Sequence, residues 1–218
     1  MALGPLVVFS LNILSALVAL MTSYYAYRFN RLAGSPLLNS ITFGFMLLGV
    51  GLLVEAGTSV TLGQTLIDIL VSRVLATITT FTYLSIQMVA YLIFAAGYAM
   101  MAFGRSVKAA ATVGVLAVTP RVVEVAGLYY YALISYFVVL VLLGFIVFQG
   151  VLIHSRSRSR FSMLVLLAFV LILVAHVILL ASVVSLSGLA FLVGTATQFF
   201  GFASLLVFLL RSGRVGAG

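Results

Sequence analysis

Six long apolar runs constrain the fold of this chain more than any other feature of its sequence. Each run is about twenty residues long, which is the length that an α-helix needs to cross a hydrocarbon core of about 30 Å. A transmembrane β-barrel is excluded, because its strands would alternate apolar and polar residues, whereas Leu164–Leu180 is almost continuously apolar. The sequence therefore predicts an all-α fold, a polytopic membrane helical bundle. The runs are Gly4–Tyr27, Leu37–Ala56, Thr77–Phe103, Gly127–Ile153, Phe161–Val184 and Leu189–Leu210.

The composition supports a membrane setting. Hydrophobic residues make up 65% of the 218 residues and charged residues only 6%, whereas soluble domains carry about 25% charged residues. The first run lacks a basic segment before it and is too long for the core of a signal peptide, so we expect it to be a true span. We predict a multi-pass plasma-membrane protein, with residues 1–218 as a single transmembrane domain.

A shorter apolar run, Val107–Val118, decides the number of spans. If this run crosses the membrane, nine of the eleven basic residues fall on one side and all three acidic residues on the other. The excess of Lys and Arg on cytoplasmic loops then predicts seven transmembrane helices, with the N-terminus outside and the C-terminus inside. The fourth helix is short, because residues 106–118 reach only roughly 20 Å at 1.5 Å per residue. Pro120, after Thr119, is expected to begin the next helix.

The densest positive charge lies in the segment IHSRSRSRF, residues 153–161. We interpret it as the cytoplasmic turn between the fifth and sixth helices, where arginines contact anionic lipid head groups at about 1 kcal/mol each. It is one short turn with no aromatic platform for stacking bases, so membrane lipid and not nucleic acid is the expected contact. Tyrosines at helix ends are expected in interfacial belts: Tyr24, Tyr25 and Tyr27 at the inner end of the first helix, and Tyr129, Tyr130, Tyr131 and Tyr136 at the outer end of the fifth.

Polar residues inside the predicted spans form the candidate ligand-binding site, because such residues are costly in a bilayer and often functional. Along the third helix, polar and aromatic residues recur at steps of four, four, three and four, which places them on one face: Tyr83, Gln87, Tyr91, Phe94 and Tyr98. The candidate pocket comprises Asn12, Glu55, Gln87, Tyr91, Tyr98, His176 and Gln198. The alternative is ordinary interhelical hydrogen bonding, worth about 0.6 kcal/mol per contact.

Two members of this set have alternatives of their own. Glu55 either pairs with Arg73, faces an extracellular ligand, or lies in water at the interface. His176 either bonds a neighbouring helix or senses protons. A haem held by two histidines is not expected, because the second histidine, His154, lies at the cytoplasmic end of its helix.

Small residues indicate where helices approach closely. The last span carries the packing stripe Gly194, Thr197, Gly201 and Ser204, and the second carries Gly44, Gly49 and Gly51. These positions predict packing within the protein or against a partner. With a short fourth helix the layout is also compatible with a weak three-plus-one-plus-three arrangement, the form used by SWEET-type transporters.

Enzymatic chemistry has few candidates in this sequence. The chain has no cysteine, two histidines and a single lysine, Lys108. A retinal Schiff base would need a lysine in the last helix, and no aspartate lies inside any predicted span. We therefore predict no catalytic residues, no metal site and no cofactor.

Several segments resemble the seven-helix sensory modules that precede histidine kinases in prokaryotes. They are LLVEAG at the end of the second span, Gln87-x-x-x-Tyr91 in the third, VAHVILL in the sixth and TQFFGFASLLVFLLR in the last. The resemblance implies a sensing role. Since no kinase or cyclase sequence follows Arg214, we expect the signal to pass to a separate protein.

The sequence thus favours a non-catalytic membrane protein that acts through a protein partner, either another membrane protein or a second copy of itself. It would be a subunit of a larger membrane complex or a receptor-like sensor. The alternative is a small-molecule transporter with a Tyr/Gln-lined interior. The absence of cysteine and the preference for arginine over lysine suit a thermophilic prokaryote.

Overall fold

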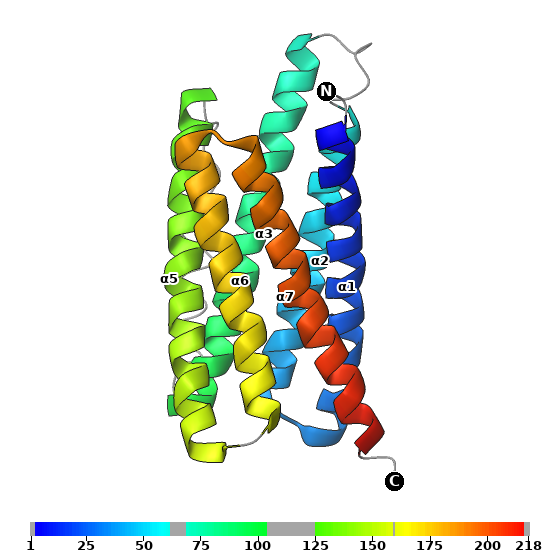
Figure 1. Ribbon diagram of the computed structural model, residues 1–218, viewed down its shortest axis with the longest axis vertical. Helices are drawn as coiled ribbons and strands as arrows, with labels where there is room; N and C mark the ends of the chain where they lie inside the picture. The colour runs from blue at the N-terminus through cyan, green and yellow to red at the C-terminus, as the bar shows by residue number, and fades with distance from the viewer. Residues whose placement is uncertain (1–2, 62–68, 104–124, 159, 216–218) are drawn as a thin grey trace.

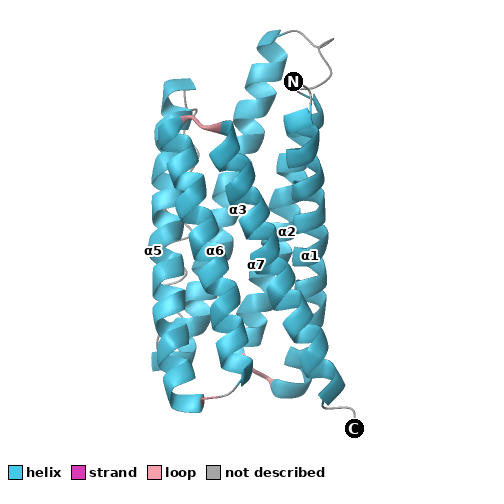
Figure 2. Ribbon diagram, viewed as in Figure 1, coloured by secondary structure: helices cyan, strands magenta, loops and turns pink. Residues whose placement is uncertain are grey.

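The computed structural model describes residues 3–61, 69–103, 125–158 and 160–215, and every regular element in them is an α-helix (Figures 1 and 2). The helices are α1 (Leu3–Ala33), α2 (Pro36–Thr61), α3 (Ile69–Phe103), α5 (Val125–Ser157), α6 (Arg160–Ser185) and α7 (Gly188–Val215). Gly34, with φ of 59°, makes the tight turn between α1 and α2, a conformation that glycine adopts at little cost.

All six described helices are long and apolar enough to cross a membrane, which confirms the six predicted spans and an all-helical integral membrane protein. α3 begins at Ile69, eight residues ahead of the predicted start at Thr77, so residues 69–76 extend the third span as a helix. The predicted short fourth span, Val107–Val118, lies outside the described residues.

The helices close into a ring in chain order. Each described helix packs against the helix before it and the helix after it, and α1 against α7 completes the circle. α3 and α5 are also direct neighbours. Figure 1 shows the helices standing side by side with nearly parallel axes. The ring has an interior, and polar side chains buried there are shielded from both lipid and water.

α3 and α5 run in the same direction through the ring. Near the start of α5, the Tyr131 hydroxyl lies 2.7 Å from the Ser85 hydroxyl of α3. Near the end of α5, Ile153 lines the same cavity as Tyr98, which lies thirteen residues after Ser85 on α3. The last residue of α3 and the first of α5 therefore lie at opposite ends of the bundle, as the colours in Figure 1 also show.

Positive charge gathers at one end of the ring, which we call the basic end. It is the lower end in Figure 1, where α1, α3, α5 and α7 finish. The arginines whose side chains the structure describes are all exposed there: Arg28, Arg31, Arg156, Arg158 and Arg211. Glu55, the one acid with a described side chain, lies towards the opposite end of α2.

Small residues bring neighbouring helices together inside the ring. A Cβ on Gly201 would lie 2.7 Å from Ile172, and one on Gly194 2.8 Å from Leu179, so both glycines pack α7 against α6. Thr197 and Ser204 hydrogen-bond carbonyl oxygens of their own helix. The glycines of the predicted stripe thus serve packing within the protein.

Candidate functional site: a buried polar cluster

The polar face of α3 points into the ring. Its five members, Tyr83, Gln87, Tyr91, Phe94 and Tyr98, are each at most 3% exposed. Burial of a continuous Tyr/Gln face in a membrane bundle is costly unless the polar atoms find partners. The partners come from α6 and α7.

The central contact joins Gln87 of α3 to His176 of α6. The Gln87 Nε2 and His176 Nε2 atoms are 2.9 Å apart, and both residues are buried. His176 Nδ1 lies 2.8 Å from the Ile172 carbonyl oxygen, which can only accept a hydrogen bond. Nδ1 therefore carries the proton, and Nε2 accepts a hydrogen bond from the Gln87 amide. The imidazole is neutral in this arrangement.

Three further side chains, Tyr83, Tyr91 and Gln198, lie near this contact. Together with Gln87 and His176 they form what we call the polar cluster. The Gln87 amide nitrogen also donates to the Tyr83 hydroxyl at 3.2 Å, and the Gln198 side chain of α7 lies close to the same hydroxyl. The Tyr91 ring meets the His176 ring edge-on, with centroids 5.1 Å apart. Helices α3, α6 and α7 are thus connected through one set of polar groups.

The polar cluster has unused hydrogen-bonding capacity. Gln87 Oε1, Tyr91 Oη and Gln198 Nε2 are buried and have no hydrogen-bond partner among the described residues. Each such group costs about 1–3 kcal/mol relative to a satisfied one. Buried atoms of α1 and α5 share this property: Asn12 Nδ2, Ser15 Oγ and Ser135 Oγ. The arrangement can therefore bind a small hydrogen-bonding molecule, or change its own hydrogen-bond pattern.

Four of the seven residues predicted for the candidate pocket lie together in the polar cluster: Gln87, Tyr91, His176 and Gln198. Glu55 is within electrostatic reach of the Tyr83 and Tyr136 hydroxyls, so it borders the polar cluster. Asn12 is buried in α1. Tyr98 is separate, because it lines a cavity at the basic end.

The expected tyrosine belt on α5 is wrong for one of its members. Tyr136 is only 5% exposed, with its ring centroid 6.3 Å from that of His176. Tyr131 stacks on Phe81 and contacts Ser85. Tyr129 and Tyr130 are exposed, as expected of interfacial residues. Tyr136, Val139, Leu143 and Ile146 are buried at helical spacing, a signal that the apolar character of the whole helix obscured.

No protein-family model, curated protein or solved structure matches this chain. Within the part of the chain that the structure describes, no three His, Cys, Asp or Glu residues come together as a metal site. The function is therefore argued from the geometry of the polar cluster and of the ring that surrounds it.

Proposed function

We propose that this protein is a non-catalytic membrane protein that acts through a separate protein partner, as a receptor-like sensor or as a responsive subunit of a larger complex. The observation that carries the proposal is the Gln87–His176 hydrogen bond, buried in the ring and bordered by polar atoms without partners. A buried polar network with unused donors and acceptors can exchange hydrogen-bond partners, which gives the bundle a second hydrogen-bond pattern.

The second pattern follows from the first by rotation of one amide. If His176 gains a proton, both ring nitrogens become donors, and the Gln87 amide must turn to present its oxygen to Nε2. The same oxygen then accepts a hydrogen bond from the Tyr83 hydroxyl, which in the first pattern accepts from the Gln87 amide nitrogen. A single proton, or a ligand that mimics it, would thus change the contacts between α6 and α3. The titratable groups nearest the imidazole are Tyr91 and Tyr136, with Glu55 beyond them.

A partner should accompany the protein through purification. Extraction from native membranes in mild detergent is expected to yield a stoichiometric second protein, or a defined homo-oligomer, by mass spectrometry. The matched control is the same preparation after exchange into a harsh detergent, in which the complex should dissociate. Recovery of a monomer alone under the mild condition would contradict the proposal.

Seven spans, with the basic end in the cytoplasm, are part of this proposal. The support is the parallel direction of α3 and α5, which places Phe103 and Val125 at opposite ends of the ring. The exposed arginines at the basic end support its cytoplasmic placement.

Reporter fusions test the orientation. A green fluorescent protein placed after Val215 should fluoresce, and alkaline phosphatase at the same position should be inactive, because the C-terminal end of α7 lies at the basic end. The matched fusion at the turn after α6, at Leu186, should give the opposite result. An active phosphatase after Val215 would contradict the assignment of the basic end to the cytoplasm.

A small-molecule transporter is the second candidate. It is favoured by the unpartnered polar atoms that α1, α3, α5 and α7 bury within the ring. Flux of a small molecule into proteoliposomes that contain the protein, lost in the Gln198→Leu variant, would favour a transporter over a protein that acts through a partner.

A further inference from the structure

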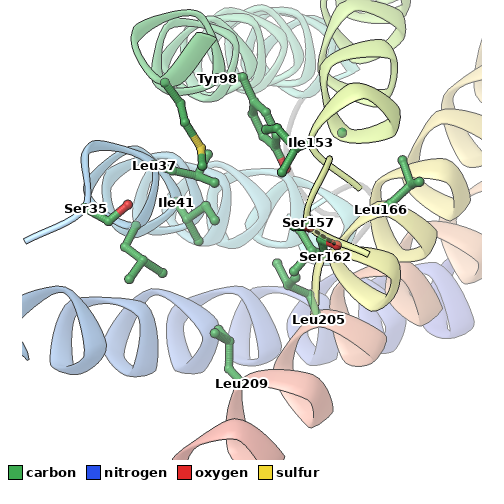
Figure 3. A pocket seen from close by; sticks show the side chains of 14 residues that line it. Ser35, Leu37, Ile41, Tyr98, Ile153, Ser157, Ser162, Leu166, Leu205 and Leu209 are labelled. Carbon is green, nitrogen blue, oxygen red and sulfur yellow. Dashed lines mark hydrogen bonds between the residues drawn. The ribbon is translucent and has the colours of Figure 1, made fainter. Parts of the chain in front are cut away.

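A cavity of about 280 Å³ lies at the basic end, away from the polar cluster (Figure 3). Five helices or their adjoining turns line it, all except α1. Its volume is close to the lower limit of small-molecule sites, roughly 300–1,000 Å³. No member of the polar cluster lines this cavity, whereas Tyr98 of the polar face of α3 does, and its ring points from α3 towards Ile153 in Figure 3.

The lining of the cavity changes from polar to apolar with depth. Three serines lie where helices begin or end: Ser35 before α2, Ser157 at the end of α5 and Ser162 in the first turn of α6. One to two turns further into the bundle the lining is hydrocarbon, with Ile41 on α2 and Leu166 on α6 as examples. From Ser157 to Gly150 the depth is roughly 10 Å at 1.5 Å per residue. A lipid in the adjacent leaflet has the same order, with its polar group at the surface and its chain inside.

Arginines lie close in sequence to the residues that line the polar mouth of the cavity. Arg156 and Arg158 flank Ser157, Arg31 precedes Ser35 by four residues, and Arg211 follows Leu209, another lining residue, by two. All four arginines are exposed. The N-termini of α2 and α6 lie at the same end of the ring, and helix N-termini favour anions.

We propose that this cavity binds one anionic glycerophospholipid of the facing leaflet. Part of one acyl chain occupies the apolar depth, and the phosphate lies at the mouth among the serines and arginines. Apolar lining alone would accept any hydrocarbon chain, and the arginines select a negative head group. This inference does not rest on the proposed function, because it concerns neither the polar cluster nor a protein partner.

Native mass spectrometry of the purified, delipidated protein tests the site. Phosphatidylglycerol and phosphatidylcholine with identical acyl chains are added at equal concentration, and bound lipids per chain are counted. The wild-type chain is expected to retain one phosphatidylglycerol under conditions that remove phosphatidylcholine. Ile153→Trp should abolish this retention by filling the cavity. Leu152→Trp is the matched control, because Leu152 is 38% exposed and does not line the cavity, and it should bind as the wild type does.

Charge variants keep the proposal testable if Ile153→Trp does not fold. Arg156→Gln and Arg211→Gln change exposed side chains, and each is expected to weaken phosphatidylglycerol binding about fivefold. Arg28→Gln is the control, because Arg28 is equally exposed on α1, which contributes no lining residue.

Three results would overturn the proposal. They are equal retention of the two phospholipids, undiminished binding by a folded Ile153→Trp protein, and tighter binding of a single-chain carboxylate such as oleate than of phosphatidylglycerol. Failure of the proposed function would appear separately, as a missing protein partner in the mild-detergent preparation.

Discussion

Replacing Gly44 with alanine is expected to lower the unfolding temperature of the purified protein strongly. The Phe94 ring of α3 occupies the space that a Cβ on Gly44 of α2 would need. The ring has little room to move, because it packs against Phe45, Tyr91 and Phe169 with centroid distances of 5.1, 5.7 and 5.8 Å. Overpacking of a rigid site costs about 1–3 kcal/mol, and we expect the upper part of that range.

The matched control is Gly144→Ala in α5. Nothing lies within 4 Å of a Cβ at that position, and alanine is preferred to glycine in a helix by about 0.5–1 kcal/mol. Gly144→Ala should therefore leave the unfolding temperature unchanged or raise it. Differential scanning fluorimetry in one detergent compares the two variants. A partial recovery of Gly44→Ala by Phe94→Leu would assign the loss to this contact, whereas equal shifts in both glycine variants would contradict the explanation.

The six spans could be predicted from the sequence because bilayer thickness fixes the length of an apolar helix. The runs ending at Ala56 and beginning at Thr77 match α2 and α3 closely in their membrane portions. The steps along α3 also placed Gln87 and Tyr91 on one face, since the helical period alone determines which side chains share a face. These predictions rest on local properties of the chain.

What the sequence could not supply is which helices meet and at what depth. The bond between Gln87 and His176 joins residues far apart in the chain, and nothing in either segment specifies the other. Tyr136 was assigned to the membrane interface because tyrosine is common there, but the ring of helices turns it towards His176. The cavity at the basic end likewise depends on five helices, so no single segment indicates it.

Replacing one partner of the Gln87–His176 contact should affect the stability of the protein differently from replacing both partners. His176→Leu removes one of the two acceptors of the buried Gln87 amide nitrogen and leaves it only the longer bond to the Tyr83 hydroxyl, which is expected to cost about 1–3 kcal/mol. Replacing both partners with leucine removes both polar groups, so the Gln87→Leu/His176→Leu protein should be at least as stable as either single variant. Thermal unfolding in one detergent measures this order. A double variant less stable than both singles, with losses that add, would contradict this expectation, because it would show that neither side chain depends on the other.

The same double variant should abolish the change between two conformations, because it lacks both the amide and the imidazole whose hydrogen bond differs between them. The chain has no cysteine, so spin labels can be placed at Tyr27→Cys and Ser155→Cys, which are exposed on α1 and α5 near the basic end. The otherwise unchanged labelled protein is expected to show two label-to-label distances, and the Gln87→Leu/His176→Leu variant only one. Thr195→Val is the control, since Thr195 is buried and bonds only its own helix, to the Phe191 carbonyl. If two distances persist in the double variant, the switching element lies elsewhere in the protein. If the labelled protein without the leucine substitutions shows a single distance, the switch between two conformations is excluded.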